Sequence, residues 1–325
     1  MNAARRYDVL TFGETMLRLS PPGFGRLEEA VSLEVRIGGS ESNTAVAAAR
    51  LGLRAAWWSR LPASPLGRRV ENEIRRWGVD TSHVLWDPSP DARVGVYFLD
   101  FGVPPRGIDV YYDRRGSAFS QLDPDAMDFS PVAQAHLLHL TGITPALGPN
   151  LLAVTHRLIT AARQSGTYIS FDVNYRAKLW TPEQARDTLN VLLPRMDLLL
   201  CTQSDAALLF GWHGPGETIA RQLRAQFGVR AAVVTCGSEG ARAVDDRGEW
   251  ASYSPDLPHI VDRVGAGDAF NAGALLGFLN NDLQTGLEYG SAMAALKHTM
   301  PGDLLLSSRQ EIEAVRSGTA HSIRR

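Results

Sequence analysis

Residues 262–278 read DRVGAGDAFNAGALLGF, in which Gly265 and Gly267 precede a single carboxylate, Asp268, and an uncharged segment follows. We expect a glycine turn that leads into a buried helix. Glycines before a helix let main-chain N–H groups approach a ligand closely, and the helix N-terminus carries a partial positive charge. The stretch therefore predicts a site for a phosphate group or a developing oxyanion that needs no lysine.

Asp268 at the start of this helix has two interpretations. A carboxylate in this position can simply cap the helix. The exposed glycine turn and the apolar helix behind it favour a base that takes a proton from a hydroxyl group. The neighbouring N–H groups would then stabilise charge on a transferring phosphoryl group. Gly273 and Gly277, four residues apart, predict close packing of the same helix in the core.

The composition excludes several classes of protein. The chain has 325 residues and a formal net charge of -2, whereas a nucleic-acid binder usually has a basic surplus. No apolar run is long enough to span a membrane, and the N-terminus lacks a secretory signal. The two cysteines form no C-x-x-C pair, which argues against a disulfide framework or structural zinc. We expect a reduced, cytoplasmic protein without nucleic-acid or membrane partners.

Lysine is scarce in this chain. Lys178 and Lys297 are the two lysines among 33 basic residues, and neither lies in the Gly-Lys-Ser/Thr context of a Walker-type phosphate loop. The V-A-I-K and H-R-D motifs of protein kinases are also absent. A protein of this composition that handles nucleotide phosphates must neutralise them in another way.

Short apolar runs alternate with longer segments of helical period, which predicts an α/β fold with a mostly parallel sheet flanked by helices. We expect one domain over residues 1–325. Two segments, 14–38 and 92–121, instead show short alternating strands and predict a small added sheet that serves as a lid or a dimer-forming flap. The candidate strands of the main sheet are 8–12, 55–59, 136–140, 168–173, 197–201 and 231–236. Helices are predicted over 65–77, ending at Gly78, and after Thr181-Pro182.

The motif DRVGAGDAFNAG resembles the C-terminal motif of the ribokinase-like, or PfkB, sugar kinases. GGSESNTAVAAARLG (38–52) and PLGRRV (65–70) resemble the N-terminal part of the same family, so the resemblance covers nearly the whole chain. It implies a three-layer α/β/α sandwich with a β-sheet lid, ATP as the donor and Mg²⁺ bridging the phosphates. It also implies Asp268 as the catalytic base and Gly265, Ala266 and Gly267 as the anion hole.

Three further stretches, 111–118, 139–147 and 171–182, are similar to 2-keto-3-deoxygluconate kinases in particular. That substrate carries a carboxylate, which the planar guanidinium of arginine binds in bidentate fashion. Arg114 and Arg176 are the candidates, although Arg114 could be a solvated charge and Arg176 could face the nucleotide phosphates. The other candidate substrate contacts are Gly39, Ser40, Glu41 and Asn43 in the first motif, Tyr97 and Tyr112 on the lid, and Asp303 in the HTMPGD stretch (298–303).

The residues that would contact ATP are predicted from weaker resemblances to the family. Residues 235–240 resemble a glycine turn near ATP in the family, and an ordinary turn between strands is the alternative. The candidate contacts are Asn174, Thr202, Thr235, Gly237, Ser238 and Gly240. The family's Asn-x-x-Glu motif is replaced by residues 202–205, so Asp205 is a candidate for Mg²⁺. Asp262, with Val264, matches positions that bind a monovalent cation such as K⁺ in some relatives.

Together these patterns predict a homo-oligomeric enzyme that transfers phosphate from ATP to a primary hydroxyl of 2-keto-3-deoxygluconate. The alternatives are a fructokinase or another neutral sugar or nucleoside kinase of the same fold, and a sugar sensor without turnover. A nicotinamide-dependent oxidoreductase is disfavoured because the first strand lacks a G-x-G-x-x-G.

Overall fold

The computed structural model describes residues 5–102 and 105–319. At its centre is an eight-stranded sheet in which β4, β1, β9, β10, β11 and β12 run parallel and β13 and β14 complete one edge antiparallel. In spatial order the strands are β14 (Glu249–Ser252), β13 (Ala241–Val244), β12 (Ala231–Thr235), β11 (Leu198–Thr202), β10 (Tyr168–Asp172), β9 (Ala135–Thr141), β1 (Tyr7–Phe12) and β4 (Ala55–Trp58). The six predicted strands are therefore all confirmed.

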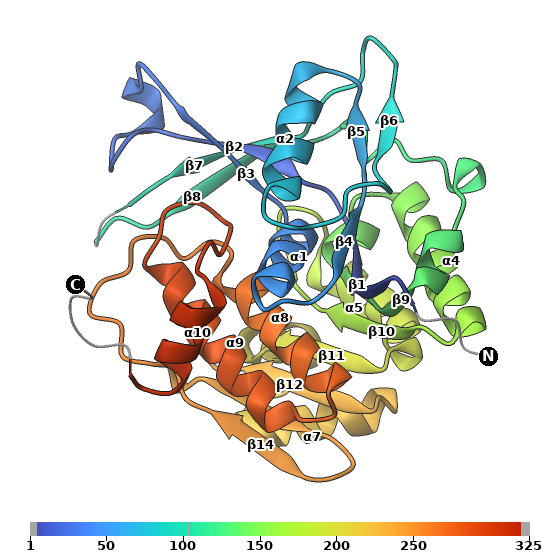
Figure 1. Ribbon diagram of the computed structural model, residues 1–325, viewed down its shortest axis with the longest axis vertical. Coiled ribbons are helices and arrows are strands. Elements are labelled where there is room, and N and C mark those ends of the chain that lie inside the picture. The colour runs from blue at the N-terminus through green and yellow to red at the C-terminus, as the bar shows by residue number, and fades with distance from the viewer. Residues whose placement is uncertain (1–4, 103–104, 320–325) are drawn as a thin grey trace.

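Helices cover both faces of this sheet, which confirms the predicted three-layer α/β/α architecture (Figure 1). One face is packed by α4 (Pro149–Ser165), α5 (Pro182–Leu192), α6 (Gln203–Phe210) and α7 (Gly216–Phe227). The other face is packed by α1 (Ser40–Arg50), α8 (Ala266–Leu279) and α9 (Leu283–His298), with α2 (Pro65–Arg75) and α10 (Arg309–Arg316) beside them. A short α3 (Ile143–Ala146) follows β9.

Local signals in the sequence explain several helix ends. Thr181 and Gln184 form a capping box at the start of α5, with Pro182 in the first position, as predicted. The helix predicted over 65–77 is α2, which ends at Arg75, and Gly78 has a left-handed φ of +88°. In α8, a Cβ on Gly273 would lie 2.2 Å from the main-chain nitrogen of Gly290. This contact confirms the predicted close packing of α8.

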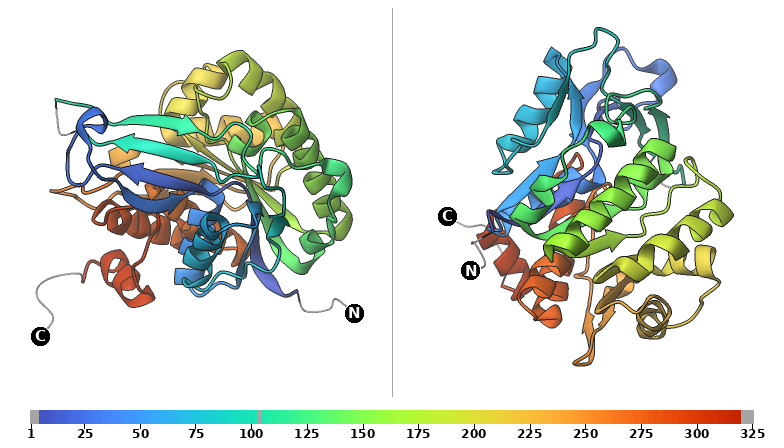
Figure 2. Two further views of the ribbon diagram at one scale, coloured as in Figure 1. Left: turned by 90° about the horizontal axis from the view of Figure 1, so that it is seen from above. Right: turned by 90° about the vertical axis from the view of Figure 1, so that its right-hand side faces the viewer.

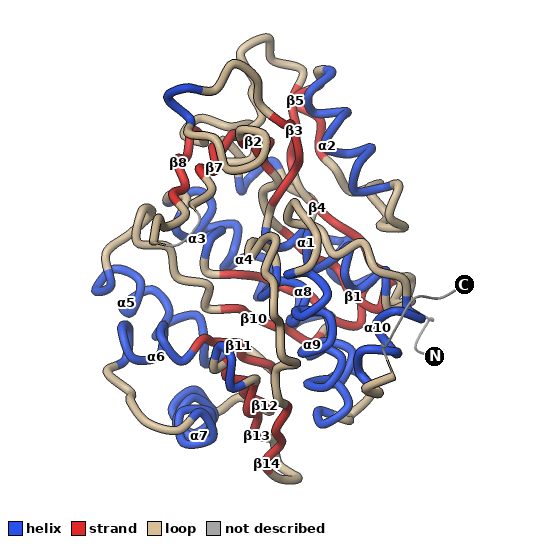
Figure 3. The backbone as a smooth tube through the Cα atoms, turned by 90° about the vertical axis from the view of Figure 1, so that its left-hand side faces the viewer, coloured by secondary structure: helices blue, strands red, loops and turns tan. Residues whose placement is uncertain are grey.

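The two segments with alternating strands form a separate small sheet. Its strands, in spatial order, are β3 (Glu34–Gly38), β2 (Met16–Ser20), β7 (Val96–Asp100) and β8 (Asp109–Asp113). Figures 2 and 3 show this sheet projecting from one end of the molecule, on the side away from β13 and β14. Residues 103–104, within the predicted segment 92–121, lie outside the described residues. A pair of short parallel strands, β5 (Arg60–Pro62) and β6 (Leu85–Asp87), lies outside both sheets.

None of the helices within the described ranges is long and apolar enough to cross a lipid bilayer.

Candidate active site

A cavity of about 640 Å³ lies between the small sheet and the carboxyl ends of strands of the large sheet. In open α/β sheets this edge is the usual place for ligands. Most of the predicted site residues line the cavity: Gly39, Ser40, Glu41, Asn43, Tyr97, Tyr112, Arg114, Asn174, Arg176, Thr202, Asp205, Gly265, Gly267, Asp268 and Asp303. Residues separated by more than 250 positions in the sequence therefore face a single space.

The glycine turn before α8 has the conformation that its sequence predicts. Gly265 has a φ of +85°, and a Cβ at this position would lie 2.0 Å from the main-chain oxygen of Asp303. Both facts require glycine. Because α8 begins at Ala266, the next residues form its first turn, where amide groups lack intrahelical acceptors. Ala266 is buried, whereas Gly265 and Gly267 line the cavity. The turn thus brings a helix N-terminus to the cavity wall.

Asp268 is held by the first turn of α1. Ser40 Oγ donates a hydrogen bond to Asp268 Oδ1 at 2.6 Å, and Asn43 Nδ2 donates to Oδ2 at 2.7 Å. The N-cap of α8 is Gly265, without a side-chain cap, so the interpretation of Asp268 as a simple helix cap is wrong. Burial raises the pKa of Asp268, while Ser40 and Asn43 oppose the rise. The carboxylate is therefore oriented at the cavity and is a stronger base than an exposed aspartate.

A second carboxylate, Asp172, lies at the end of β10 on the cavity wall. Its Oδ2 accepts hydrogen bonds from Asn271 Nδ2 at 2.8 Å and Asn174 Nδ2 at 3.0 Å. Burial raises the pKa of Asp172 to about 7, and the nearby Asp268 and Asp205 contribute. Asn174 also donates to Ser40 Oγ at 2.9 Å. Asp172 was not among the candidate residues, although its place near the end of the predicted strand 168–173 was a usable signal.

Glu41 provides another buried carboxylate beside the cavity. Thr141 Oγ1 donates to its Oε1 at 2.6 Å, and Thr144 Oγ1 donates to the same oxygen at 3.2 Å. Burial raises the pKa of Glu41 to about 7, and Asp268 adds to the rise. These two threonines fix the carboxylate against the end of β9.

Arg114 is buried rather than solvated, so the alternative of a free surface charge is wrong. Its Nε donates to Glu14 Oε2 at 2.8 Å, and its Nη2 donates to the same oxygen. We expected a bidentate contact with a ligand, but Glu14 already engages two of the three guanidinium nitrogens. Glu14 Oε1 is buried and has no hydrogen-bond partner among the described residues. The pair therefore lines the cavity with one guanidinium nitrogen that Glu14 does not engage.

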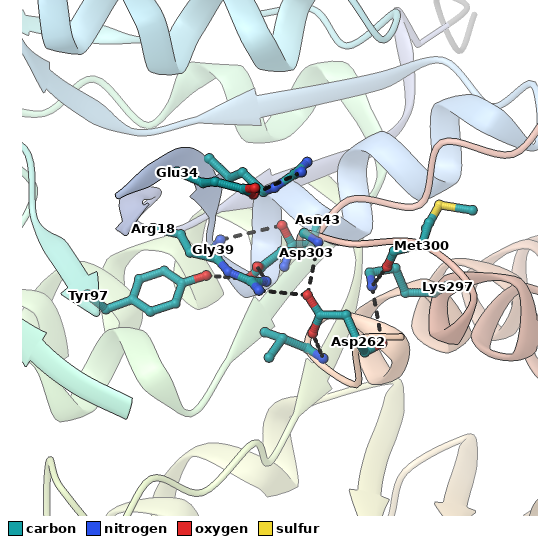
Figure 4. A network of polar contacts seen from close by, with 12 residues as sticks. Arg18, Glu34, Gly39, Asn43, Tyr97, Asp262, Lys297, Met300 and Asp303 are labelled. Atoms are coloured by element: carbon teal, nitrogen blue, oxygen red, sulfur yellow. Dashed lines mark hydrogen bonds and ion pairs between the residues drawn. The ribbon is translucent and has the colours of Figure 1, made fainter. Parts of the chain in front are cut away.

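Figure 4 shows a buried polar network behind the cavity, centred on Arg18 of β2. Arg18 pairs with Asp303 Oδ1 at 2.7 Å and with Asp262 Oδ2 at 2.7 Å, while Tyr97 donates to Asp303 Oδ2 at 2.6 Å. Burial raises the pKa of Asp303, and Arg18 and Tyr97 oppose the rise. Sequence reasoning missed Arg18 because its partners lie far away along the chain. The network connects the small sheet to the loop before α8.

The geometry of Asp262 does not support the predicted monovalent-cation site. Its Oδ1 accepts from Val264 N at 3.0 Å, and its Oδ2 accepts from Gly302 N at 2.9 Å as well as from Arg18. Both carboxylate oxygens are thus occupied by protein donors.

The predicted nucleotide contacts divide into two groups. Thr202 caps α6, since its Oγ1 accepts from Asp205 N at 2.9 Å, and both residues line the cavity. The second group lies outside the cavity lining, in the turn that joins β12 to the antiparallel β13: Thr235, Gly237, Ser238 and Gly240. Thr235 is the neighbour of Thr202 in adjacent strands. Both interpretations of this segment require a turn between two strands, which the structure shows, and nucleotide binding there stays a prediction.

The described residues contain no cluster of three or more His, Cys, Asp or Glu side chains that could hold a metal ion. Mg²⁺ usually keeps several waters and uses one or two carboxylates together with substrate phosphates. Asp172 and Asp205 both line the cavity and fit such a site. Burial raises the pKa of Asp205, and a nearby divalent cation would counteract this shift.

Two basic side chains that were not among the candidate residues, Lys178 and Arg263, also line the cavity.

Comparisons with known proteins agree with this geometry. A family model described as "pfkB family carbohydrate kinase" matches residues 7–308. The chain is 44% identical over 315 residues to a 2-dehydro-3-deoxygalactonokinase of Haloferax volcanii, covering 96% of this chain and 97% of that protein. It is 32% identical over 302 residues to a 2-dehydro-3-deoxygluconokinase of Bacillus subtilis, covering 92% of each. The crystal structure of a 2-dehydro-3-deoxygluconokinase from Thermotoga maritima superposes with a TM-score of 0.88 at 33% identity, covering 95% of this chain and 99% of that one.

Proposed function

This chain belongs to the PfkB family of carbohydrate kinases, and from that premise we propose that it transfers the terminal phosphoryl group of ATP to the primary hydroxyl of 2-dehydro-3-deoxygluconate (2-keto-3-deoxygluconate). At the coarser level it is a kinase of 2-dehydro-3-deoxy sugar acids. The observation that carries the proposal is that the Asp268 carboxylate and the Arg114 guanidinium line one cavity. A base for a hydroxyl and a cation for a carboxylate are the two groups that such a substrate needs.

Asp268 is the base of the proposed reaction. Ser40 and Asn43 fix the orientation of both carboxylate oxygens, so one of them accepts the proton of the substrate hydroxyl as the new O–P bond forms. The main-chain amides of Gly265, Ala266 and Gly267 face the phosphoryl group and stabilise its charge. Burial raises the pKa of Asp268, and Arg176 lies near enough to oppose this rise.

The opposite end of the substrate is recognised by charge. Arg114 donates to the substrate carboxylate from the nitrogen that Glu14 leaves free, and Arg176 provides a second cation on the cavity wall. Tyr97, Tyr112 and the first turn of α1 (Gly39, Ser40, Glu41 and Asn43) enclose the rest of the sugar acid, and Asp303 lies behind them.

ATP is the proposed donor, bound along the edge of the sheet that carries Asn174, Thr202 and the turn at 235–240. Asp172 and Asp205 are the residues that would hold Mg²⁺ when it accompanies the nucleotide. Bound there, the ion would neutralise charge on the phosphates. Because the chain offers no Walker-type lysine, the helix N-terminus of α8 and the exposed Arg263 are the positive groups on the protein side.

The second candidate substrate is 2-dehydro-3-deoxygalactonate, which the 44% identity to a galactonokinase favours. The two acids differ only in configuration at one carbon. A screen of ADP release should therefore compare both acids with fructose and a nucleoside. We expect kcat/KM for at least one of the acids to exceed that for the neutral compounds by about 10²-fold or more, because a site with buried charged groups rejects analogues that leave them unpaired.

The same screen decides among the other candidates. Preferential turnover of fructose or a nucleoside would identify a neutral-sugar kinase and contradict the proposal. Binding of a sugar acid without ADP release would identify a sensor. If the kcat/KM values for the two acids were nearly equal, the protein would be a kinase that accepts both epimers.

We also propose that the small sheet, acting as a lid, joins two copies of the chain. Several apolar side chains are exposed on it or on its connecting loops, among them Phe24, Val31, Val35 and Tyr111. Light scattering during gel filtration should give a homo-oligomer, and the double variant Val31→Glu/Val35→Glu should give a smaller species. A monomeric wild-type chain at micromolar concentration would contradict this arrangement.

A further inference from the structure

Lys297 has an unusual environment near the end of α9. The residue is 0% exposed and is one of the two lysines in the whole sequence. Its Nζ donates to the main-chain oxygen of Met300 at 3.0 Å and lies 3.4 Å from that of Asp262 (Figure 4). A buried ammonium group is costly unless its charge is compensated. Its position therefore suggests a role beyond packing.

The two carbonyl groups belong to the two segments that build the glycine turn. Asp262 starts the stretch that leads through Val264 to Gly265, and Met300 lies in the loop that leads to Asp303. These segments are already in contact, since a Cβ on Gly265 would collide with the Asp303 oxygen and Gly302 N donates to Asp262 Oδ2. The Lys297 ammonium binds both segments at once, directly behind the turn.

Within the ion-pair network of Arg18, Asp262 and Asp303, the Lys297 ammonium group supplies the second positive charge. The buried network contains two carboxylates, Asp262 and Asp303, and two cations, Arg18 and Lys297. Burial lowers the pKa of Lys297, whereas Asp262 and Asp303 counteract this shift. Without the ammonium group, the network would hold one uncompensated negative charge and two carbonyl oxygens facing the space it leaves.

Main-chain carbonyl oxygens can replace the hydration shell of a monovalent cation such as K⁺, and a nearby negative charge would favour the ion. We predicted such an ion at Asp262, but its carboxylate oxygens accept from Val264, Gly302 and Arg18, and its main-chain oxygen faces Lys297. The residues present therefore do not fit a bound K⁺ ion.

We propose that the Lys297 ammonium group takes the place of a monovalent cation and holds the glycine turn in its working position, so that the protein needs no K⁺. Lys297 is a positioning residue in this proposal, because it acts on the turn through main-chain oxygens and touches no substrate. The effect on stability is independent of the substrate, whereas the effect on turnover rests on the proposed function.

The first test uses the wild-type protein. Melting temperature and kcat are measured in K⁺, Na⁺ and choline chloride at equal ionic strength. We expect both to agree among the three salts, with kcat within about twofold. Stimulation of kcat by K⁺ of more than about fivefold over choline, or a melting temperature raised by K⁺ alone, would overturn the proposal. The melting measurement needs no turnover, so it reports on Lys297 even if the proposed substrate is wrong.

The second test uses Lys297→Met, which keeps most of the side-chain volume and removes the charge. We expect the variant to lose at least about tenfold in kcat in choline and to recover several-fold in kcat and several degrees in melting temperature in K⁺ or NH₄⁺. Met293→Ala is the control, because Met293 is buried on the same helix within an apolar cluster and carries no charge. It should lose stability equally in all salts. Equal defects of Lys297→Met in K⁺ and choline would contradict the proposal.

Discussion

Asn43 Nδ2 donates to Asp268 Oδ2 at 2.7 Å, and this hydrogen bond joins the first turn of α1 to the first turn of α8. The two residues are 225 positions apart in the sequence. With Ser40 on the other oxygen, the contact leaves Asp268 in one orientation at the cavity. The N-terminal motif therefore does more than line the cavity, because it also orients the proposed base.

Replacement of that base tests its role. We expect Asp268→Asn to lower kcat by about 10²–10⁴-fold, the range of a general base, while the KM for ATP changes little. The amide nitrogen of the new side chain replaces one carboxylate oxygen and faces either Ser40 or Asn43, both of which donate to Asp268, so a modest loss of thermal stability should accompany the change. Steady-state kinetics with a melting curve at each condition separates the two effects. Turnover within tenfold of wild type would show that Asp268 is not the base.

The two glycines of the turn should respond differently to alanine. At Gly265 a Cβ would lie 2.0 Å from the Asp303 oxygen at a φ of +85°, so Gly265→Ala should lower both melting temperature and kcat. At Gly267 nothing lies within 4 Å of a new Cβ, which would stand on the cavity wall. Gly267→Ala should therefore keep its stability and lose about tenfold or more in kcat/KM, since the methyl group blocks close approach to the main-chain amides. An equal decrease in melting temperature in both variants would contradict this interpretation of the two glycines.

The sequence predicted the main sheet well because each of its parallel strands is a short apolar run bounded by turns, as in Leu198–Thr202. It also predicted the glycine turn, where local geometry dictates the residue type. It did not predict the partners of charged groups. Arg18 shows no pattern in the sequence, yet it pairs with Asp262 and Asp303, more than 240 positions away. The monovalent cation expected at Asp262 is a similar case, because the motif is local whereas Arg18 and Lys297, which we propose take its place, are not.

Glu41 should make the stability of the protein depend on pH. Its folded-state pKa of about 7 lies above the ordinary value of 4.5, so the folded state holds the proton more tightly than the unfolded state. Below pH 4.5 both states are protonated, and the favourable contribution is complete. As pH rises through about 7, burying the charged carboxylate costs on the order of 3 kcal/mol at most, and stability falls.

Glu41→Gln removes this ionisation and keeps an oxygen for Thr141. We expect its melting temperature, relative to wild type, to be several degrees higher at pH 8 than at pH 5. The exposed Glu29→Gln serves as the control and should show no such difference. Asp172 titrates in the same direction in both proteins, so the difference between them isolates Glu41. A relative melting temperature that is constant from pH 5 to 8 would contradict the assigned pKa.

Substitutions at Arg114 and Glu14 test whether the cavity recognises the negative charge of a sugar acid. Arg114→Ala removes a cation and also leaves Glu14 unpaired on the cavity wall. A sugar acid then loses an attraction and meets a repulsion, whereas fructose meets neither. We expect kcat/KM for the acid to fall by about 10²–10³-fold, and that for fructose by less than tenfold. Arg115→Ala is the matched control, because Arg115 is the adjacent arginine and is exposed.

The double variant Arg114→Ala/Glu14→Gln separates the two contributions. Neutralising Glu14 removes the repulsion but restores no attraction, so activity on the acid should recover by about tenfold and remain below wild type. No recovery would mean that the carboxylate of Glu14 does not face the acid group. If Arg114→Ala lowered kcat/KM equally for the sugar acid and for fructose, Arg114 would hold the small sheet in place and would not recognise the charge of the substrate.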